Sequence, residues 1–523
     1  MNLPRIMEEN KLYKSLIICV ILFVSLLSGA ILPRFTVGGF ELKNIDLFAD
    51  LRVKYSTDVT SNALSSNRQR VFDLTYLPYI KSYTRYLAAS DGISRLMELP
   101  DFSTVGADRN NQLIYRLKTE RSRNYRPVSE LVTGSSLFVD YSPDQSTLNH
   151  FFQVLNGLKQ GTGKGRIAMF GDSFIEGDIF CADIRNALQD IFGGNGVGFV
   201  PITSEVSQFR FTIGHSFTGF QSYSVVKKVE QSEPYGPGGF CFIPGEKNNV
   251  TYSVKTNYKH LNLFREVKLF FSSPESTVFK YALNNGSENT LNVAASEHLQ
   301  QGILKNINAS TISFNFPASD TLKLYGVSFE DSTGIYVDNF GLRGNSGLGL
   351  YQISEKMHRQ FNQLQDYQLI ILQYGLNVVA PDSKDLNWYI NPMINIVEKL
   401  KRSYPDASIL LMGVSDRSTK IDGDYRTMES IPVMIAAQRE IARRSQIAFF
   451  NLFEAMGGEN SMVAYVESDP PLANKDYTHL TFQGGRKVAG IFVKSLLNEF
   501  QKYNDQFKNR VPADSLNYIG SIQ

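Results

Sequence analysis

Two short polar motifs, far apart in the chain, contain the residue types of a nucleophilic catalyst. Gly171-Asp172-Ser173-Phe174 directly follows the apolar run 167–170, and Asp476-Tyr477-Thr478-His479 lies near the C-terminus. A serine hydroxyl is a weak nucleophile at neutral pH, so it needs a base, and a neutral histidine needs a partner that holds its tautomer. The two motifs therefore supply candidates for the nucleophile, base and orienting acid of a hydrolase.

The composition indicates a globular protein of enzyme size. Its 523 residues are 42% hydrophobic, enough for at least one large core. The 53 basic and 51 acidic residues nearly cancel, which argues against nucleic acid as the main partner. The three cysteines (Cys19, Cys181 and Cys241) cannot form a disulfide framework, and the six histidines are scattered. We expect no metal and no cofactor.

An apolar segment near the N-terminus predicts export. Residues 16–32 are uncharged and follow Arg5, Lys11 and Lys14, so we expect an N-terminal transmembrane helix within 1–34. A cleaved signal peptide remains the alternative, because Ser28-Gly29-Ala30 offers small residues near the end of the run. Both readings export the body of the chain. We expect either the cell inner membrane with a periplasmic catalytic body, or a protein exported after signal cleavage.

The rest of the chain divides by its hydrophobic pattern. Residues 35–135 are polar and mixed, a juxtamembrane region of unknown fold, and 506–523 form a C-terminal tail. Short apolar runs alternate with helical patterns in 136–205 and 332–505, which predicts an α/β domain with a parallel sheet. Between them, 206–331 contain alternating strand-like segments, typical of an inserted all-β sandwich.

Four blocks in order carry a family resemblance. They are Gly171-Asp172-Ser173, Gly341-Leu342-Arg343-Gly344-Asn345-Ser346, Gly375-Leu376-Asn377 and Asp476-Tyr477-Thr478-His479. Together they resemble the SGNH (GDSL-type) hydrolase superfamily, which implies a three-layer α/β/α flavodoxin-like fold.

The resemblance also implies residue roles. Ser173 would be the nucleophile, His479 the general base and then general acid, and Asp476 the orienting carboxylate. The oxyanion hole would consist of the backbone N–H groups of Ser173 and Gly344 and the side-chain amide of Asn377. Acyl transfer needs such fixed donors because a carbonyl oxygen becomes negative. Asp172 is expected to be a structural hydrogen-bonding residue, and Arg343 and Glu176 to be solvated charges near the site.

An SGNH domain that a β module interrupts between the serine block and the second glycine block resembles the bacterial peptidoglycan O-acetylesterases. In those enzymes the insert is similar to a carbohydrate-binding module. This implies an exported esterase acting on an acetylated polysaccharide, with peptidoglycan as the expected substrate. Two alternatives remain: an O-acetyltransferase supplied by a membrane acetyl-donor protein, or a catalytically idle glycan-binding protein. Three tyrosines of the insert are candidates for sugar contact, although such residues more often fill a core: Tyr223, Tyr235 and Tyr258.

Overall fold

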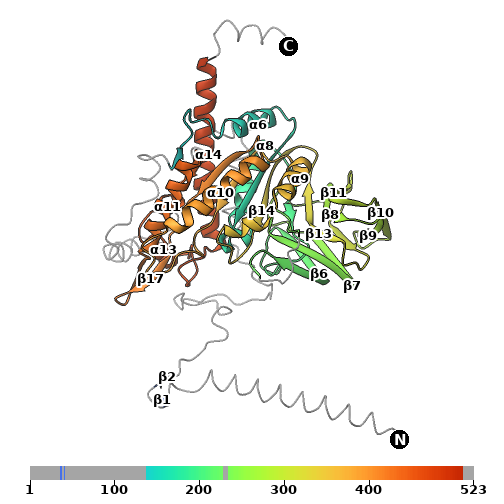
Figure 1. The fold of residues 1–523 in the computed structure, drawn as a ribbon, viewed down its shortest axis with the longest axis horizontal. Helices are drawn as coiled ribbons and strands as arrows, with labels where there is room; N and C mark the ends of the chain where they lie inside the picture. The colour runs from blue at the N-terminus through green and yellow to red at the C-terminus, as the bar shows by residue number, and fades with distance from the viewer. Residues whose placement is uncertain (1–35, 38–39, 42–136, 228–233, 511–523) are drawn as a thin grey trace, which may run out of the picture. The chain divides into compact units, whose positions relative to one another are not determined.

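The computed structural model describes residues 36–37, 40–41, 137–227 and 234–510. The chain divides into two compact units, Met1–Leu74 and Thr75–Gln523. In the first unit the described residues form the antiparallel pair β1 (Thr36–Val37) and β2 (Phe40–Glu41). The second unit holds everything described below (Figure 1).

A six-stranded sheet forms the centre of this body, with strand order β14-β4-β15-β16-β19-β3. All neighbours pair in parallel except β19 and β3, which pair antiparallel. The strands are β14 (Gly334–Gly341), β4 (Lys164–Gly171), β15 (Leu369–Gln373), β16 (Ser408–Met412), β19 (Ala448–Phe450) and β3 (Phe138–Asp140).

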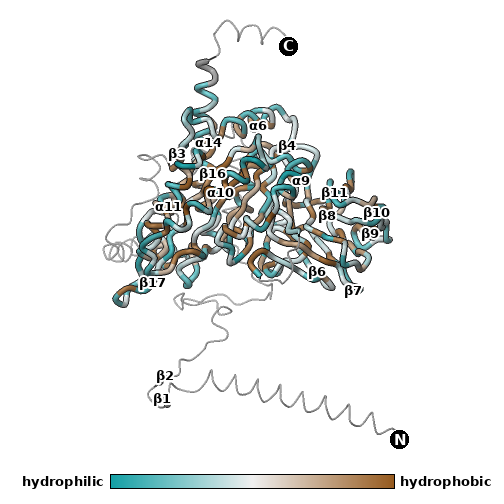
Figure 2. The backbone as a smooth tube through the Cα atoms, in the orientation of Figure 1, coloured by the Kyte–Doolittle hydropathy of each residue, from teal (hydrophilic) through white to brown (hydrophobic). Residues whose placement is uncertain are grey.

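Helices pack on both faces of this sheet because its strands are apolar on both sides. In β4, Ala168 and Phe170 belong to one hydrophobic core, whereas Ile167 and Met169 belong to the other. The apolar stretches accordingly gather in the inner strands, and the outer loops are mostly hydrophilic (Figure 2). Burying one such side chain stabilises the fold by about 1.5–3 kcal/mol.

The helices divide between these two cores. The first core contains side chains of α9 (Glu355–Gln365), α10 (Asn387–Ser403) and α11 (Ser430–Arg444). The second contains side chains of α6 (Asn149–Lys159), α8 (Cys181–Phe192), α12 (Leu452–Met456), α13 (Ser461–Glu467) and α14 (Phe482–Arg510). The 3-10 helix η3 (Leu348–Gln352) follows β14.

A second, nine-stranded sheet lies beside the first (Figure 1). The strand β7 (Phe240–Val254) is its longest and pairs with β6 (Ile213–Ser224), β12 (Thr311–Asn315) and β13 (Lys323–Glu330). The remaining strands are β5 (Gly198–Val200), β8 (Glu266–Ser273), β9 (Thr277–Leu283), β10 (Glu288–Val293) and β11 (Ser296–Leu304). These strands contribute to a third hydrophobic core.

The predicted fold class is wrong in two structural respects. The central sheet is mixed, because the short edge strand β3 runs antiparallel to β19. The insert is hydrogen-bonded as one sheet and not as the two separate sheets of a sandwich, because β7 is long enough to pair with different strands along its length. This sheet also recruits β5, which precedes the predicted start of the insert. The predicted domain limits stay a prediction.

The predicted transmembrane helix is not found either. Within the part of the chain that the structure describes, no helix is both long and apolar enough to cross a membrane. Residues 16–32, on which that prediction rested, lie outside the described residues.

A buried cluster of charges joins the two sheets. The Glu330 carboxylate, at the end of β13, lies 2.8 Å from Arg166 Nη2, 2.9 Å from Lys164 Nζ and 3.1 Å from Lys268 Nζ. Arg166 also pairs with Asp338 of β14 at 3.1 Å. Burial by itself raises the pKa of Glu330, but the three cations outweigh burial and hold the pKa below its usual value. This carboxylate therefore stabilises the junction in its charged form.

Replacing Glu330 by glutamine should destabilise the protein by about 3–5 kcal/mol, because it leaves buried cations without their counter-charge. Thermal or denaturant unfolding would measure this loss. In wild type, the stabilisation by the Glu330 carboxylate is fully present above the ordinary glutamate pKa and disappears only as the pH falls through the lowered pKa of the folded protein. The destabilisation caused by the substitution should therefore be fully visible at neutral pH. The control is Glu288→Gln, which removes an exposed pair with Lys280 and should change little. Equal stability of the two variants would contradict a stabilising role for the buried cluster.

Candidate active site

Ser173 stands at the turn from β4 into the short helix α7 (Ser173–Glu176). Asp172 caps this helix, since its Oδ1 accepts the Phe174 N–H at 3.0 Å. A glycine is needed at 171, because a Cβ there would lie 2.3 Å from a side-chain carbon of Ile175 and 3.1 Å from the Gln373 carbonyl oxygen. The tight strand-to-helix turn thus fixes the place of the serine.

The structure brings the three predicted triad residues together. Ser173 Oγ lies 3.0 Å from His479 Nε2, and His479 Nδ1 lies 2.8 Å from Asp476 Oδ2. The side chains of His479 and Asp476 are 39% and 49% exposed, so solvent and substrate can reach them. A proton can therefore pass from the serine to the imidazole while the carboxylate holds the ring.

The loop that carries Asp476 and His479 is fixed by local bonds. Asp476 Oδ1 accepts the backbone N–H groups of Thr478 at 2.9 Å and of His479 at 3.0 Å. Burial raises the pKa of Asp476, but the hydrogen bonds from His479 outweigh this effect and the pKa lies below its usual value. Asp476 is thus ionised at neutral pH, as an orienting carboxylate must be.

A hairpin that sequence reasoning missed supports this loop. The strands β17 (Ser418–Ile421) and β18 (Asp424–Thr427) place Tyr425 against Tyr477, with stacked rings 3.7 Å apart. The Ser418 N–H also donates to the Tyr477 carbonyl oxygen at 3.0 Å. Tyr477 has a φ of +54°, a left-handed conformation that these contacts help to hold. In the sequence, the only indication of this support was that Tyr477 lies between Asp476 and His479.

The predicted oxyanion donors lie around the same turn. The bonds within the turn use the N–H groups of Phe174, Ile175 and Glu176 and not that of Ser173. Gly344 has a φ of +75° with open space where a Cβ would stand, so glycine suits both the conformation and the approach of a ligand.

Asn377, the third predicted donor, is held by two acceptors. Its Nδ2 donates to Asp172 Oδ2 at 3.0 Å and to the Asn345 carbonyl oxygen at 3.3 Å. The first bond orients the amide. Donation to a substrate oxygen would replace the longer bond to Asn345.

Asp172 therefore links the nucleophile turn to Asn377. It is fully buried, and burial raises its pKa to about 6, against the hydrogen bonds from Phe174 and Asn377. Above that pH the carboxylate is charged and binds the Asn377 amide strongly. Below it, protonation weakens the bond that orients this donor.

Asp172→Asn should lower kcat by about 10- to 100-fold, since a hydrogen bond to a charged group contributes about 1.5–3 kcal/mol. The acid limb of the wild-type pH–rate profile should also become shallower in the variant, because one group that titrates near pH 6 is removed.

The matched control is Asp416→Asn. Asp416 is equally buried and its pKa is also raised to about 6 by burial, but it accepts bonds from Thr427 and Met462 instead of Asn377. An identical flattening of the acid limb in both variants would contradict the positioning role of Asp172.

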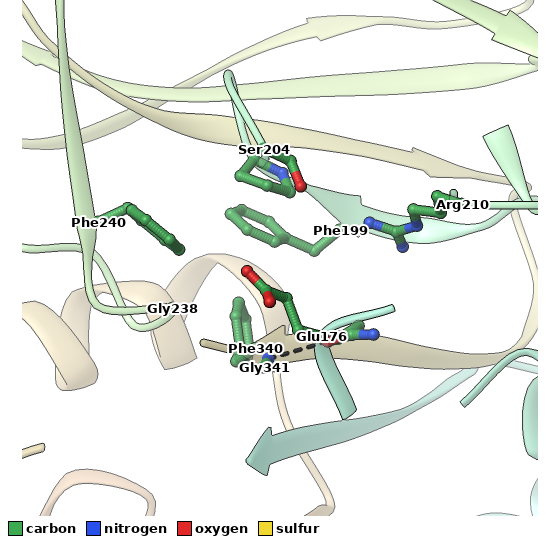
Figure 3. Close-up of a pocket in the computed structure, with 10 residues that line it drawn as sticks. Glu176, Phe199, Ser204, Arg210, Gly238, Phe240, Phe340 and Gly341 are labelled. Carbon is green, nitrogen blue, oxygen red and sulfur yellow. Dashed lines mark hydrogen bonds between the residues drawn. The ribbon is translucent and has the colours of Figure 1, made fainter. Parts of the chain in front are cut away.

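The expectation that Glu176 and Arg343 are solvated charges is wrong for Glu176, which is buried. Glu176 is 8% exposed, and its Oε2 accepts Arg343 Nε at 2.6 Å. Burial raises the pKa of Glu176, and Arg343 opposes that rise. The Glu176 carboxylate points into a hollow between α7 and the nine-stranded sheet (Figure 3). Its lining residues are Glu176, Phe199, Pro201, Ser204, Arg210, Gly238, Phe240, Asn339, Phe340 and Gly341.

Comparisons with known proteins agree with this geometry at the level of the fold. No family model matches the chain, and no curated protein matches it. A solved structure of a peptidoglycan O-acetylesterase superposes with a TM-score of 0.58 at 22% identity, covering 70% of this chain and 99% of the other.

More distant solved structures include a family two carbohydrate esterase from Cellvibrio japonicus, with 9% identity, a TM-score of 0.22 and coverage of 55% and 99%. A GDSL-like lipase from Parabacteroides merdae has 15% identity, a TM-score of 0.24 and coverage of 31% and 72%. The chain therefore shares the fold of that solved peptidoglycan O-acetylesterase structure, and a Ser–His–Asp constellation lies at its site.

Proposed function

We propose that this protein is a serine esterase that removes O-acetyl groups from a cell-envelope polysaccharide, with peptidoglycan as the substrate. The continuous hydrogen-bonded series Ser173–His479–Asp476 carries the proposal, because a scaffold without activity has no need of that geometry. The fold-level likeness to a peptidoglycan O-acetylesterase supports the choice of substrate. A periplasmic location follows from that substrate.

The proposed reaction has two halves. His479 Nε2 takes the proton of Ser173 as Oγ attacks the acetyl carbonyl carbon, and the oxyanion meets the Ser173 N–H, the Gly344 N–H and the Asn377 amide. Collapse of this intermediate breaks the ester bond, and the imidazolium protonates the departing sugar oxygen. Water then gives a proton to His479 and attacks the acetyl-serine. As the acyl bond breaks, the imidazolium returns this proton to Ser173 Oγ, which releases acetate and restores Ser173.

The test is to incubate the full chain with O-acetylated peptidoglycan, with and without a soluble glycan acceptor, and to follow free acetate and newly acetylated sugar. We expect acetate as the main product even with acceptor present, because the exposed His479 ring is open to water. Preferential transfer to the acceptor would instead establish an acetyltransferase. Absence of both products would contradict the proposed function.

A further inference from the structure

The loop of residues 201–212, between β5 and β6, contains a three-residue segment that reverses the usual pattern of burial. Phe209 is 72% exposed and Phe211 is 43% exposed, whereas Arg210 between them is only 3% exposed. Arginine is rarely buried unless paired, and phenylalanine is usually inside. The loop thus holds its charge inward and presents two aromatic rings to solvent.

Buried polar bonds anchor this loop. Arg210 Nη2 lies 3.6 Å from Asp178 Oδ2, and Arg210 Nε donates to Thr212 Oγ1 at 3.1 Å. Thr212 Oγ1 in turn donates to Asp178 Oδ2 at 2.7 Å, and a bidentate pair with Arg185 holds Asp178 itself. Asp178 comes two residues after the end of α7, so the loop is fixed to the segment that follows Ser173.

Further bonds fix the backbone beside each phenylalanine. Lys255 Nζ donates to the Arg210 carbonyl oxygen at 2.8 Å, and Asn257 Nδ2 donates to the Phe211 carbonyl oxygen at 3.1 Å. A loop backbone held this way loses little conformational freedom when the loop binds a ligand. These polar side chains also place hydrogen-bonding groups next to the rings.

The same loop contacts the histidine side of the site. The Phe211 ring meets the Phe482 ring edge-on, with centroids 4.0 Å apart. Phe482 begins α14, three residues after His479. The loop therefore lies beside the triad, attached both to the serine segment and to the histidine segment. Arg210 and Ser204 of this loop also line the hollow into which Glu176 points (Figure 3).

We propose that Phe209 and Phe211 form an aromatic platform that binds a sugar ring of the polymeric substrate, next to the sugar whose ester Ser173 attacks. This inference rests on the proposed function and names residues that select a glycan polymer. The apolar C–H face of a sugar stacks on an aromatic ring, while its hydroxyls need polar neighbours, which Lys255 and Asn257 supply nearby.

The tyrosines expected to contact sugar are less suitable. Tyr235 is buried, at 2% exposed, and Tyr258 donates its hydroxyl to Asp183 at 3.3 Å. Tyr223 is half-buried against the first hydrophobic core. Among the described aromatic residues of the insert, Phe209 and Phe211 are the most exposed.

The test compares wild type with Phe209→Ala on O-acetylated peptidoglycan and on a small acetyl ester, in the full chain. The loss of kcat/KM on the polymer should exceed that on the small ester by about 3- to 10-fold, mainly through KM. Phe217→Ala is the matched control. Phe217 is an aromatic residue that is 37% exposed and lies on β6, the strand that follows the loop of Phe209. This variant should change the ratio between the substrates by less than about twofold.

Equal losses on both substrates, or no loss on either, would overturn the platform. If wild type hydrolyses the small ester but releases no acetate from peptidoglycan, the proposed function fails. A separate measurement of binding to peptidoglycan then tests the aromatic platform. Ser173→Ala protein should sediment with insoluble peptidoglycan, and adding Phe209→Ala should weaken this binding about 3- to 10-fold. Absence of binding, unchanged binding, or a Phe209-dependent affinity for phosphatidylglycerol vesicles instead of glycan would overturn the inference.

Discussion

Replacing Ser173 by alanine is expected to lower kcat on a small acetyl ester by about 10⁴- to 10⁶-fold. The variant lacks the oxygen that forms the acetyl intermediate, and removal of a triad nucleophile typically leaves only the contribution of the oxyanion donors and of binding. The change removes one hydroxyl at a half-buried position, so folding should be preserved. Steady-state kinetics and a thermal melt of the same preparation would measure both properties.

The matched control is Ser287→Ala, an exposed serine in the turn between β9 and β10. This variant should keep the wild-type rate. Retention of full activity by Ser173→Ala would show that another group attacks the ester. A lowered melting temperature together with the lost rate would indicate that the variant is misfolded. Sedimentation of the variant with peptidoglycan would check this, because a misfolded protein should no longer bind the glycan.

Asp476→Asn should lower kcat by about 10⁴-fold while changing KM little. An amide can still accept the backbone bonds from Thr478 and His479, but it no longer holds His479 Nδ1–H as a carboxylate does, and it cannot stabilise the imidazolium that forms. Because the pKa of Asp476 lies below its usual value, wild type should not lose this function until the pH falls below the ordinary aspartate range.

Asp320→Asn, an exposed substitution near β13, serves as the control and should retain the wild-type rate. A loss of less than about tenfold in Asp476→Asn would mean that another group orients the imidazole. A large rise in KM with constant kcat would point to a binding role for Asp476 instead.

The close arrangement of Ser173, His479 and Asp476 could be predicted from the sequence because each part of it is local. A glycine and a capping aspartate shape the serine turn within a few residues, and Asp476 and His479 are three residues apart on one loop. A strand such as β15 is likewise recognisable as a short apolar run. Local patterns could not show that the serine turn and the loop of Asp476 and His479 lie together. The order of the four blocks implied this contact through a family resemblance.

The parts that failed depend on pairing between distant segments. Local alternation identifies strands but not their partners, so it could not show that β5 joins β13 or that β7 connects the insert into one sheet. The inverted burial at Phe209-Arg210-Phe211 was equally hidden, because only the fold shows that Asp178 is within reach of Arg210. Glu176 was misjudged for the same reason, since the insert helps to bury it.

The most direct test of the account is covalent labelling of the full chain with a fluorophosphonate, which reacts with activated serines, followed by mass spectrometry of the peptides. We predict a single major adduct on Ser173, formed much more slowly in His479→Ala. Labelling of a different serine, or equal labelling of Ser173 without His479, would contradict the claim that His479 activates Ser173 as the nucleophile.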